Sequence, residues 1–243
     1  MENAQSKTIL VYGATGRAGR LVVERALGEG WAVSAFVRNP DKLPEKLRFK
    51  VNVIKGDLGD PNSISSAIRS CRPNAIVDAS SAIPFGHAKA QPANNADRSI
   101  IIRSTVNALE ADGRLNECVL LIVSGQLLPE PGGTINSFSV AAMAWVLRTF
   151  VARKSWQELQ KALRWCFEST PPSFRFIYAR MGQMVEEPSR GRLQAEPTLN
   201  NIQHGSVSYV DVAEALVRLA SDKDRKWERK AIFFNYAGSS TPL

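Results

Sequence analysis

The sequence predicts an α/β fold in which a doubly wound parallel sheet is covered by helices on both faces and carries a small C-terminal elaboration. Three observations lead to this prediction: an apolar strand that runs into a glycine-rich turn and a helix, a regular alternation of strands and helices after it, and strands that are apolar along nearly their whole length. Strands of this kind are buried on both faces, which is typical of parallel sheets. A length of 243 residues suits one such domain, and we expect residues 1–243 to form it.

A dinucleotide site is predicted by the opening segment, Lys7-Thr-Ile-Leu-Val-Tyr-Gly13-Ala-Thr-Gly16-Arg-Ala-Gly19-Arg. Gly13 permits a tight turn, Gly16 lets the backbone approach a pyrophosphate, and Gly19 lets the following helix, expected at 20–27, pack closely on the strand. Free N–H groups at the start of that helix then face the phosphates. The candidate cofactor-binding residues of this segment are Gly13, Thr15, Gly16, Arg17, Ala18 and Gly19.

The choice of dinucleotide depends on the end of the second predicted strand, residues 31–38. An acidic residue there would bind the ribose 2′-hydroxyl of NAD, but this strand ends on Arg38. A guanidinium matches a 2′-phosphate in geometry and charge, and Arg17 could approach the same phosphate. Asp41 lies too far along the chain to reach a ribose easily. The sequence therefore predicts NADP(H) as the cofactor, in preference to NAD(H).

The alternation of strands and helices continues along the chain. We expect strands at 51–57, 74–80 and 117–125, a helix from Asp60-Pro61 to about Cys71, a long helix at about 95–111, and a late strand from Lys230. Two segments rich in Pro, Gly and Asn, at 126–137 and 186–206, are expected to be loops at the substrate end.

Composition limits the function classes. An apolar fraction of 44% and a charged fraction of 22% are ordinary for a globular protein, no apolar run approaches the ~20 residues of a membrane span, and the N-terminus has no signal-peptide pattern. Three cysteines and two histidines predict neither a disulfide framework nor a metal site, so we expect a cytoplasmic protein. The formal charge of +8 is dispersed, and the densest cluster, 222–230, is interleaved with acids. It predicts a solvated helix end and loop, without a nucleic-acid or membrane partner.

The spacing G-x-x-G-x-x-G resembles the short-chain dehydrogenase/reductase superfamily, and GATG-x-x-G resembles its atypical, NmrA-like NAD(P)-binding branch, which has a Rossmann fold. Gly56-Asp57-Leu58 is similar to an element of that superfamily that contacts adenine. Asp78-Ala79-Ser80-Ser81 sits where its fourth strand passes the ribose. The resemblance thus implies cofactor contacts from Asp57, Leu58, Ala79, Ser80 and Ser81. Asp211 falls in a segment similar to the I-x-x-x-D-V-A element, and we expect it to be structural rather than catalytic.

The superfamily reduces carbonyl groups with a Ser, a Tyr and a Lys four residues after that Tyr. Ser124, at the end of the fifth predicted strand, matches the serine, unless it only terminates a buried strand. Lys154 resembles the lysine, which would also bind the nicotinamide ribose, but Phe150 stands at the tyrosine position and has no proton to give. Tyr12, Tyr178, Tyr209 and Tyr236 are not expected to replace it. Water, the ribose, His87 or His204 remain as proton donors.

Residues 138–151, ahead of Lys154, form either a core or dimer face or the wall of a substrate pocket. Two functions follow from these residues and from the resemblance. One is an NADP(H)-dependent oxidoreductase that reduces a small carbonyl or quinone-type substrate; the other is a redox sensor or scaffold that binds NADP(H) without turning it over. Either is compatible with a monomer or a homodimer.

Overall fold

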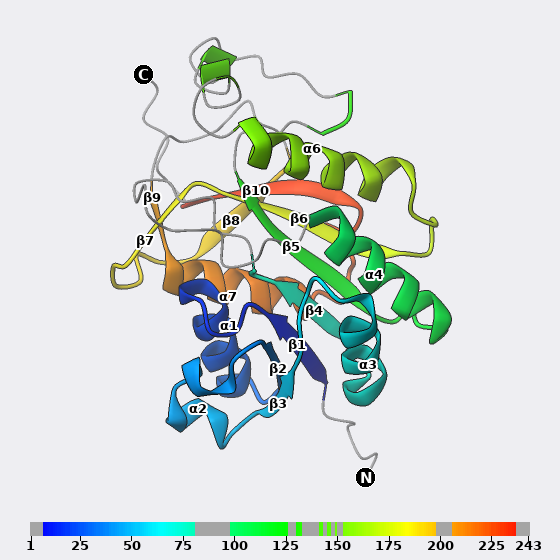
Figure 1. The fold of residues 1–243 in the computed structure, drawn as a ribbon. Coiled ribbons are helices and arrows are strands. Elements are labelled where there is room, and N and C mark those ends of the chain that lie inside the picture. Colours follow the sequence, from blue (N-terminus) through cyan, green and yellow to red (C-terminus); the bar gives the residue numbers. More distant parts are fainter. Residues whose placement is uncertain are drawn as a thin grey trace.

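Eight strands form the main sheet of the computed structural model, which describes residues 7–80, 98–125, 130–132, 141–142, 145–146, 149, 153–197 and 206–236. In order across the sheet (Figure 1) they are β3 (Asn52–Lys55), β2 (Ala32–Val37), β1 (Thr8–Tyr12), β4 (Ala75–Asp78), β5 (Val119–Gly125), β6 (Arg175–Met181), β10 (Lys230–Tyr236) and β8 (Leu193–Glu196). Every pair is parallel except β10 with β8. The strand order reverses between β1 and β4, and the prediction of a doubly wound α/β fold is confirmed.

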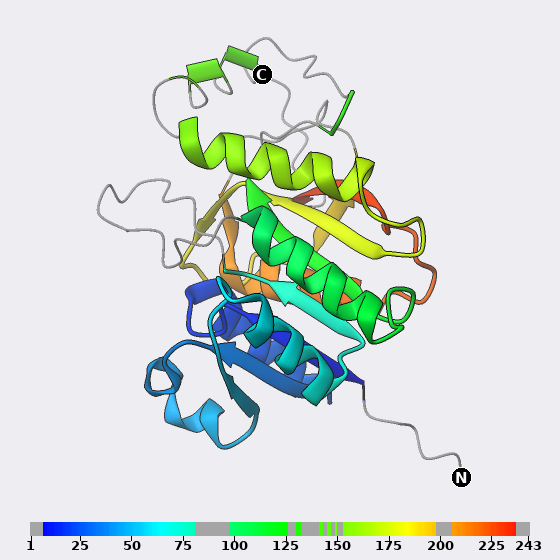
Figure 2. The same cartoon turned by 45° about the vertical axis from the view of Figure 1, so that its right-hand side comes forward.

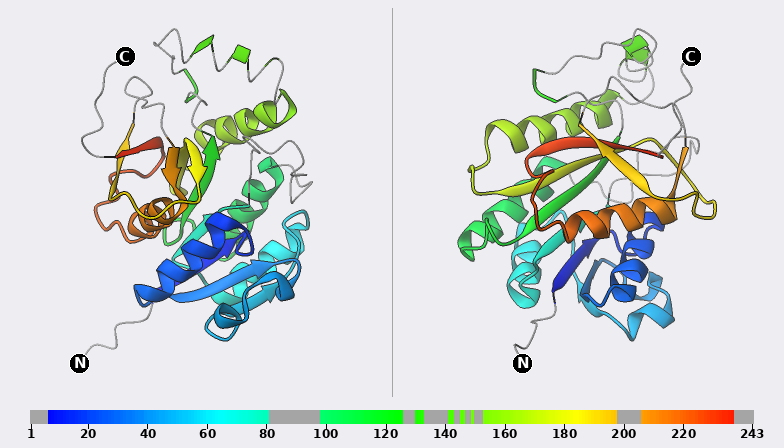
Figure 3. Two further views of the ribbon diagram at one scale, coloured as in Figure 1. Left: turned by 90° about the vertical axis from the view of Figure 1, so that its left-hand side faces the viewer. Right: turned by 180° about the vertical axis from the view of Figure 1, so that it is seen from behind.

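Helices cover both faces of this sheet (Figures 1 and 3). On one face lie α1 (Arg17–Gly28) and α7 (Tyr209–Ala220); on the other lie α3 (Pro61–Cys71), α4 (Arg98–Ala111) and α6 (Arg153–Glu168), side by side in that order (Figure 2). Successive residues of β1 enter the two cores in turn: Ile9 and Val11 pack with α1 and α7, and Leu10 and Tyr12 pack with the other three helices. Burial on both faces explains why this strand is apolar throughout.

The segment predicted as a loop at 186–206 contains a strand, so that prediction is wrong for Leu193–Glu196. β8 pairs with the outer edge of β10, and the side chain of Leu193 is fully buried in the core beside α7. The pairing satisfies an edge whose N–H and C=O groups would otherwise have no partners, and it makes the sheet mixed at this end. The remaining short elements are η1 (Pro40–Lys42), α2 (Glu45–Arg48), and the two-stranded parallel pair of β7 (Gln183–Val185) with β9 (Ser206–Ser208).

Local signals set several element boundaries. The Asp60 carboxylate accepts hydrogen bonds from the N–H groups of Asn62 (3.0 Å) and Ser63 (3.2 Å), and Pro61 is the first residue of α3, as predicted. Helix α1 begins at Arg17, three residues earlier than expected. Residues 81–92, most of 126–137, and both histidines lie outside the described residues.

The basic cluster at 222–230 is only partly solvated, which corrects the prediction for its C-terminal end. Glu228 accepts a hydrogen bond from Arg175 Nε (2.7 Å), and the Arg229 guanidinium donates to the carbonyl groups of Pro171 and Phe174. These contacts tie the cluster to the start of β6.

Among the described residues, no helix is both long and apolar enough to cross a bilayer, and no three His, Cys, Asp or Glu side chains are grouped as metal ligands. All three cysteines are free thiols, and burial raises the pKa of Cys118 and Cys166 to about 12, so these two thiols are unreactive at neutral pH.

Candidate functional site: the carboxyl ends of the strands

The glycine turn after β1 is closely packed. Gly13 has φ +73°, and a Cβ atom on it would lie 2.8 Å from the carbonyl oxygen of Ala79. A Cβ atom on Gly19 would lie 2.2 Å from the carbonyl oxygen of Gly13. The turn and packing roles predicted for Gly13 and Gly19 are therefore confirmed, because neither position accepts a side chain.

The start of α1 is open for a ligand. Gly16 is the N-cap, no side chain caps the helix, and Thr15, Gly16 and Arg17 are exposed whereas Ala18 is half-buried. A Cβ atom on Gly16 would meet only the Gly13 oxygen, at 3.2 Å. The first N–H groups of a helix have no partner inside it, so this end offers donors to an anion.

The two arginines assigned to a 2′-phosphate have different surroundings. Arg38 follows β2, is exposed, and has no hydrogen bond or ion pair with any residue that the structure describes. Arg17 instead lies 3.4 Å (Nη1 to Oε1) from Glu186, and its guanidinium is 5.2 Å from the ring centroid of Tyr209 at the start of α7. Arg17 is thus turned toward α7, whereas Arg38 lies at the end of β2.

The segment after β3 combines a buried and an exposed candidate. Leu58 is buried, and a Cβ atom on Gly56 would lie 2.6 Å from the ring of Phe36, so this turn packs tightly against β2. The exposed Asp57 accepts a hydrogen bond from the N–H of Gly59 (2.8 Å). This bond fixes the carboxylate at the end of the strand, and Asp57 retains acceptor capacity for a ligand.

A buried ion pair lies at the end of β4, where sequence reasoning identified only the cofactor-contacting segment. Asp78 and Arg98 are 1% and 5% exposed, and Arg98 Nη2 lies 3.4 Å from Asp78 Oδ2. Asp78 Oδ1 accepts hydrogen bonds from the N–H (3.1 Å) and the hydroxyl (2.5 Å) of Ser80. Ser81 lies outside the described residues. The one signal in the sequence was an arginine next to the apolar run Ile100-Ile101-Ile102 of α4.

Ser124, next to the last residue of β5, is the first donor in a chain of hydrogen bonds. Its hydroxyl donates to Tyr178 Oη (3.2 Å), and the Tyr178 hydroxyl donates to the carbonyl group of Leu159 in α6 (3.3 Å). Tyr178 has only one hydroxyl hydrogen, so Ser124 donates its own hydrogen to Tyr178 in this arrangement.

Tyr178 nevertheless cannot take the place of the missing acid. Its side chain is fully buried, and burial raises its pKa to about 12, against the lowering effects of the Arg98 charge and of the Ser124 hydrogen bond. The expectation that no tyrosine replaces Phe150 stays a prediction, because Phe150 itself lies outside the described residues. Lys154 is in the first turn of α6, as its resemblance implied, and its side chain is likewise not described.

Arg180 is the register partner of Ser124 in the neighbouring strand, and its side chain is bonded within the protein. Its guanidinium donates to the carbonyl groups of Ala231 (2.5 Å) and Pro197 (3.2 Å), and burial lowers its pKa to about 10. Arg180 therefore holds β10 and the chain after β8 to β6.

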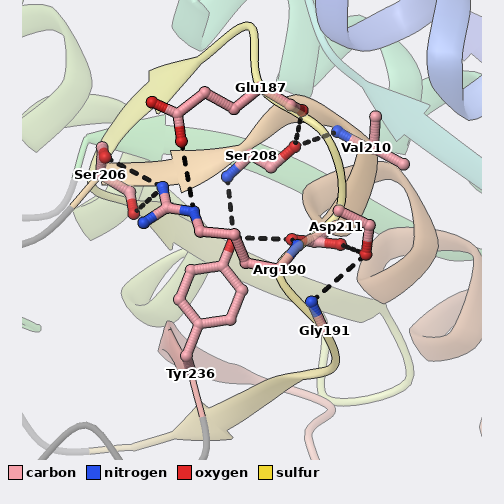
Figure 4. A network of polar contacts seen from close by, with 9 residues as sticks. Glu187, Arg190, Gly191, Ser206, Ser208, Val210, Asp211 and Tyr236 are labelled. Atoms are coloured by element: carbon pink, nitrogen blue, oxygen red, sulfur yellow. Dashed lines mark hydrogen bonds and ion pairs between the residues drawn. The ribbon is translucent and has the colours of Figure 1, made fainter.

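A second polar network fixes the segment after β7 (Figure 4). The Asp211 carboxylate accepts hydrogen bonds from the Ser189 hydroxyl (2.5 Å), the Arg190 N–H (2.9 Å) and the Tyr236 hydroxyl (2.7 Å). The Arg190 guanidinium lies 4.9 Å from the Tyr236 ring centroid and donates to Ser206. Asp211 sits in the first turn of α7, and these internal contacts are those of a structural residue, as predicted.

This network borders a pocket beside the glycine turn. The pocket has a volume of about 310 Å³ and lies between the first turns of α1 and α7 and the chain after β7. Its lining consists of Arg17, Arg20, Leu21, Glu186, Glu187, Pro188, Tyr209 and Val210. The glycine turn and the C-terminal elaboration therefore meet at the carboxyl-end side of the sheet, where open α/β sheets bind ligands.

Comparison with known proteins identifies the family. A family model described as NAD(P)H-binding matches residues 13–223. The chain belongs to this NAD(P)H-binding family. The glycine turn, the uncapped start of α1 and the free Arg38 fit such a cofactor, since they provide close backbone approach, N–H donors and a cation.

Individual relatives fall into two groups. Oxidoreductase AgnL4 of Paecilomyces divaricatus is 26% identical over 234 residues, which is 93% of this chain and 84% of that protein. Photosystem II assembly factor Ycf39 of Guillardia theta is 39% identical over 84 residues, which is 35% of this chain and 26% of that protein. For that factor, and for a chloroplastic Arabidopsis thaliana relative of which 12% is covered, the match spans well under a third of the relative.

Solved structures share the fold. A short-chain dehydrogenase/reductase from Veillonella parvula in complex with NADP superposes with a TM-score of 0.71 at 17% identity, covering 97% of each chain. The similarity agrees with the predicted Rossmann-like architecture.

Proposed function

We propose that this protein is an NADP(H)-dependent oxidoreductase that reduces a small carbonyl or quinone-type compound. The observation that carries the proposal is the position of Ser124, a buried hydroxyl at the carboxyl end of β5, in a chain of the NAD(P)H-binding family. The match to oxidoreductase AgnL4 over most of both chains supports an enzymatic role.

Arg38 supports the choice of NADP(H) over NAD(H). It is exposed, follows the strand that neighbours β1, and has no partner among the described residues that would compete for its guanidinium. A 2′-phosphate would give it a charged, bidentate partner. Arg17 belongs to the proposal as a second cation that would have to leave Glu186.

The chain's own groups divide the work as follows. Bound NADPH supplies a hydride. Ser124 turns the hydroxyl hydrogen that it directs to Tyr178 toward the substrate carbonyl oxygen, which can only accept a hydrogen bond, and Lys154 holds the nicotinamide ribose. The proton for the reduced oxygen comes from water, from a ribose hydroxyl or from a histidine, because neither Phe150 nor the buried Tyr178 can donate it.

An NADPH oxidation assay with a panel of aldehydes, ketones and quinones tests the proposal. We expect turnover with at least one compound, and a loss of at least tenfold in kcat/KM for Ser124→Ala, since one hydrogen bond to a reacting group is worth about 1.5–3 kcal/mol. The α3 variant Ser70→Ala is the control, because Ser70 only donates to its own helix at Ala67. Tight NADPH binding without turnover of any compound would reject the enzymatic role.

Phe150→Tyr tests the proposed position of Phe150. If it stands at the superfamily's tyrosine position, the new phenol lies within reach of Lys154 and raises carbonyl reduction, because general acid catalysis contributes about 10²–10⁴-fold. Phe49→Tyr, at an exposed site at the C-terminal end of α2, is the matched control. No gain for Phe150→Tyr on any carbonyl would contradict the assignment.

A second candidate is an NADP(H)-binding sensor or scaffold without turnover. Phe150 at the tyrosine position favours it, and so does the similarity of part of the chain to an assembly factor. For both candidate functions we propose a monomer or homodimer in the cytoplasm, without a nucleic-acid or membrane partner.

A further inference from the structure

Two opposite charges are buried together between the carboxyl ends of β4 and β5. Asp78 is the last residue of β4 and Arg98 is the first described residue of α4. Arg98 Nη2 donates to the carbonyl group of Val123 (2.6 Å), which precedes Ser124, and lies 3.4 Å from both the carbonyl oxygen and Oδ2 of Asp78. One guanidinium nitrogen therefore links the ends of two neighbouring strands.

The same pair shapes the turn that follows β4. Asp78 Oδ1 accepts both the N–H and the hydroxyl hydrogen of Ser80, which fixes Ala79 and Ser80 against the glycine turn. Their backbone atoms lie so close to Gly13 that a Cβ atom there would meet Ser80 Cα at 2.8 Å. Because the Ser80 hydroxyl donates inward, its lone pairs are left for a ligand above the strand ends.

Burying two charges carries a desolvation penalty, which a purely structural role does not explain. Among the described residues, Arg98 Nε and Asp78 Oδ2 have no hydrogen-bond partner, although both atoms are buried. Replacing a buried ion pair with apolar side chains is often neutral or stabilising, so the fold alone does not require these groups. The pair instead fixes the strand ends on both sides of the point where the strand order reverses, and open α/β sheets bind their ligands there.

We propose that Asp78 and Arg98 are positioning residues for the nicotinamide-ribose half of the cofactor. They act through Ser80 and the end of β5, whereas the glycine turn and Arg38 serve the adenosine half. The inference rests on cofactor binding, which the family membership supplies, and does not require that the protein turns a substrate over.

The test compares two ligands that share the adenosine half. NADPH carries both halves; adenosine 2′,5′-bisphosphate carries adenine, its ribose, the 2′-phosphate and the 5′-phosphate, but neither the second phosphate of the pyrophosphate nor the nicotinamide ribose. For the double variant Asp78→Asn/Arg98→Met, which removes both charges together, we expect NADPH affinity to fall about threefold to tenfold, the value of one lost hydrogen bond between neutral groups, and the bisphosphate affinity to change less than about twofold. Arg38→Ala is the control and should weaken both ligands.

Melting temperatures measured on the same samples establish that the variants are folded. If the double variant does not fold, Ser80→Ala gives the decisive comparison: a loss for NADPH of about threefold or more with an unchanged bisphosphate affinity supports the proposal. Equal losses for the two ligands, or no loss for either, would overturn it and leave the pair a structural one. Absence of turnover in the substrate panel rejects the enzymatic proposal but does not alter these binding constants.

Discussion

Polar side chains are used differently in two regions of the molecule. Around β1, β2 and β3 they remain exposed: Arg38 has no partner among the described residues, and Thr15 and Arg17 surround an uncapped helix start. Around β7, β9 and β10 they bind one another, as Asp211 and Arg190 do in the network of Figure 4. The first region leaves polar groups open to solvent, whereas the polar groups of the second hold the C-terminal elaboration in place.

Arg17 links the two regions. It belongs to the glycine turn by sequence, but its contacts are with Glu186 and Tyr209 of the C-terminal part. The difference between the regions thus separates groups that await a ligand from groups that build the fold, and each variant below tests one side of that separation.

The largest expected effect is a loss of stability in Gly19→Ala, which tests how tightly α1 packs on the glycine turn. In Gly19→Ala the new Cβ atom would lie 2.2 Å from the Gly13 oxygen, and the contact is with backbone that cannot move away cheaply. We expect a loss of about 3 kcal/mol or more in the free energy of unfolding. Urea denaturation measures it.

Gly28→Ala, in the same helix, is the control for that substitution. Nothing lies within 4 Å of its Cβ position, so stability should change by less than about 1 kcal/mol. Similar stabilities for the two variants would show that α1 does not pack on the turn as described.

Arg38→Ala tests the exposed side of the comparison. The variant removes the partner proposed for the 2′-phosphate, which is worth about 1.5–3 kcal/mol, so NADPH affinity should fall at least about tenfold while NADH affinity stays nearly constant. Fluorescence titration gives both constants, with the exposed α3 residue in Arg69→Ala as the control. Equal affinities of the parent protein for NADH and NADPH would end the NADP assignment.

Asp211→Asn tests the internally paired side. Burial alone would raise the pKa of Asp211, but hydrogen bonds from Ser189, Tyr236 and Arg190 hold it below its ordinary value. A carboxylate with a lowered pKa stabilises the folded state above its unfolded pKa of about 3.9, and this contribution is lost as the pH falls through the folded value.

At pH 7 we therefore expect Asp211→Asn to destabilise the protein by about 2 kcal/mol, and the difference from the parent to shrink below about pH 4. Melting curves between pH 3 and pH 7 follow it. The exposed Asp224→Asn should change stability by less than about 0.5 kcal/mol at every pH. A pH-independent difference for Asp211→Asn would mean that its charge is not what stabilises the network.

The features predicted from sequence are those with a local cause. Gly13 and Gly19 are recognisable because backbone geometry admits no other residue, and Asp60-Pro61 is recognisable because a cap and its helix are adjacent in the chain. The late strand Lys230–Tyr236 was found through its apolar run. Each of these signals acts within a few residues.

The features missed are those that join distant segments. Arg98 meets Val123 across 25 positions, and Ser124 meets Tyr178 across 54, and neither pairing leaves a periodic signal. The sequence does not predict β8 because its core-facing side, Leu193 and the small Ala195, is a weak apolar signal, and because it pairs with β10, about forty residues later. Hydrogen bonds of this kind depend on strand order and register, which one sequence does not specify residue by residue.

The smallest expected effect decides to which region Arg17 belongs. Its ion pair with Glu186 joins side chains that are 53% and 68% exposed, and such pairs are worth about 0.2–1 kcal/mol. If Arg17 serves a cofactor phosphate, Glu186→Gln frees it, and NADPH affinity should rise about two- to fivefold at low salt and less at high salt.

Glu187→Gln removes the same charge one residue away, from a carboxylate that pairs with Arg190, and controls for general repulsion. The gain should also vanish in the background of Arg17→Ala, because Glu186 and the cofactor phosphate then have no guanidinium to compete for. If both glutamine variants change affinity equally, Arg17 is not released to the cofactor, and it belongs with the groups that build the fold.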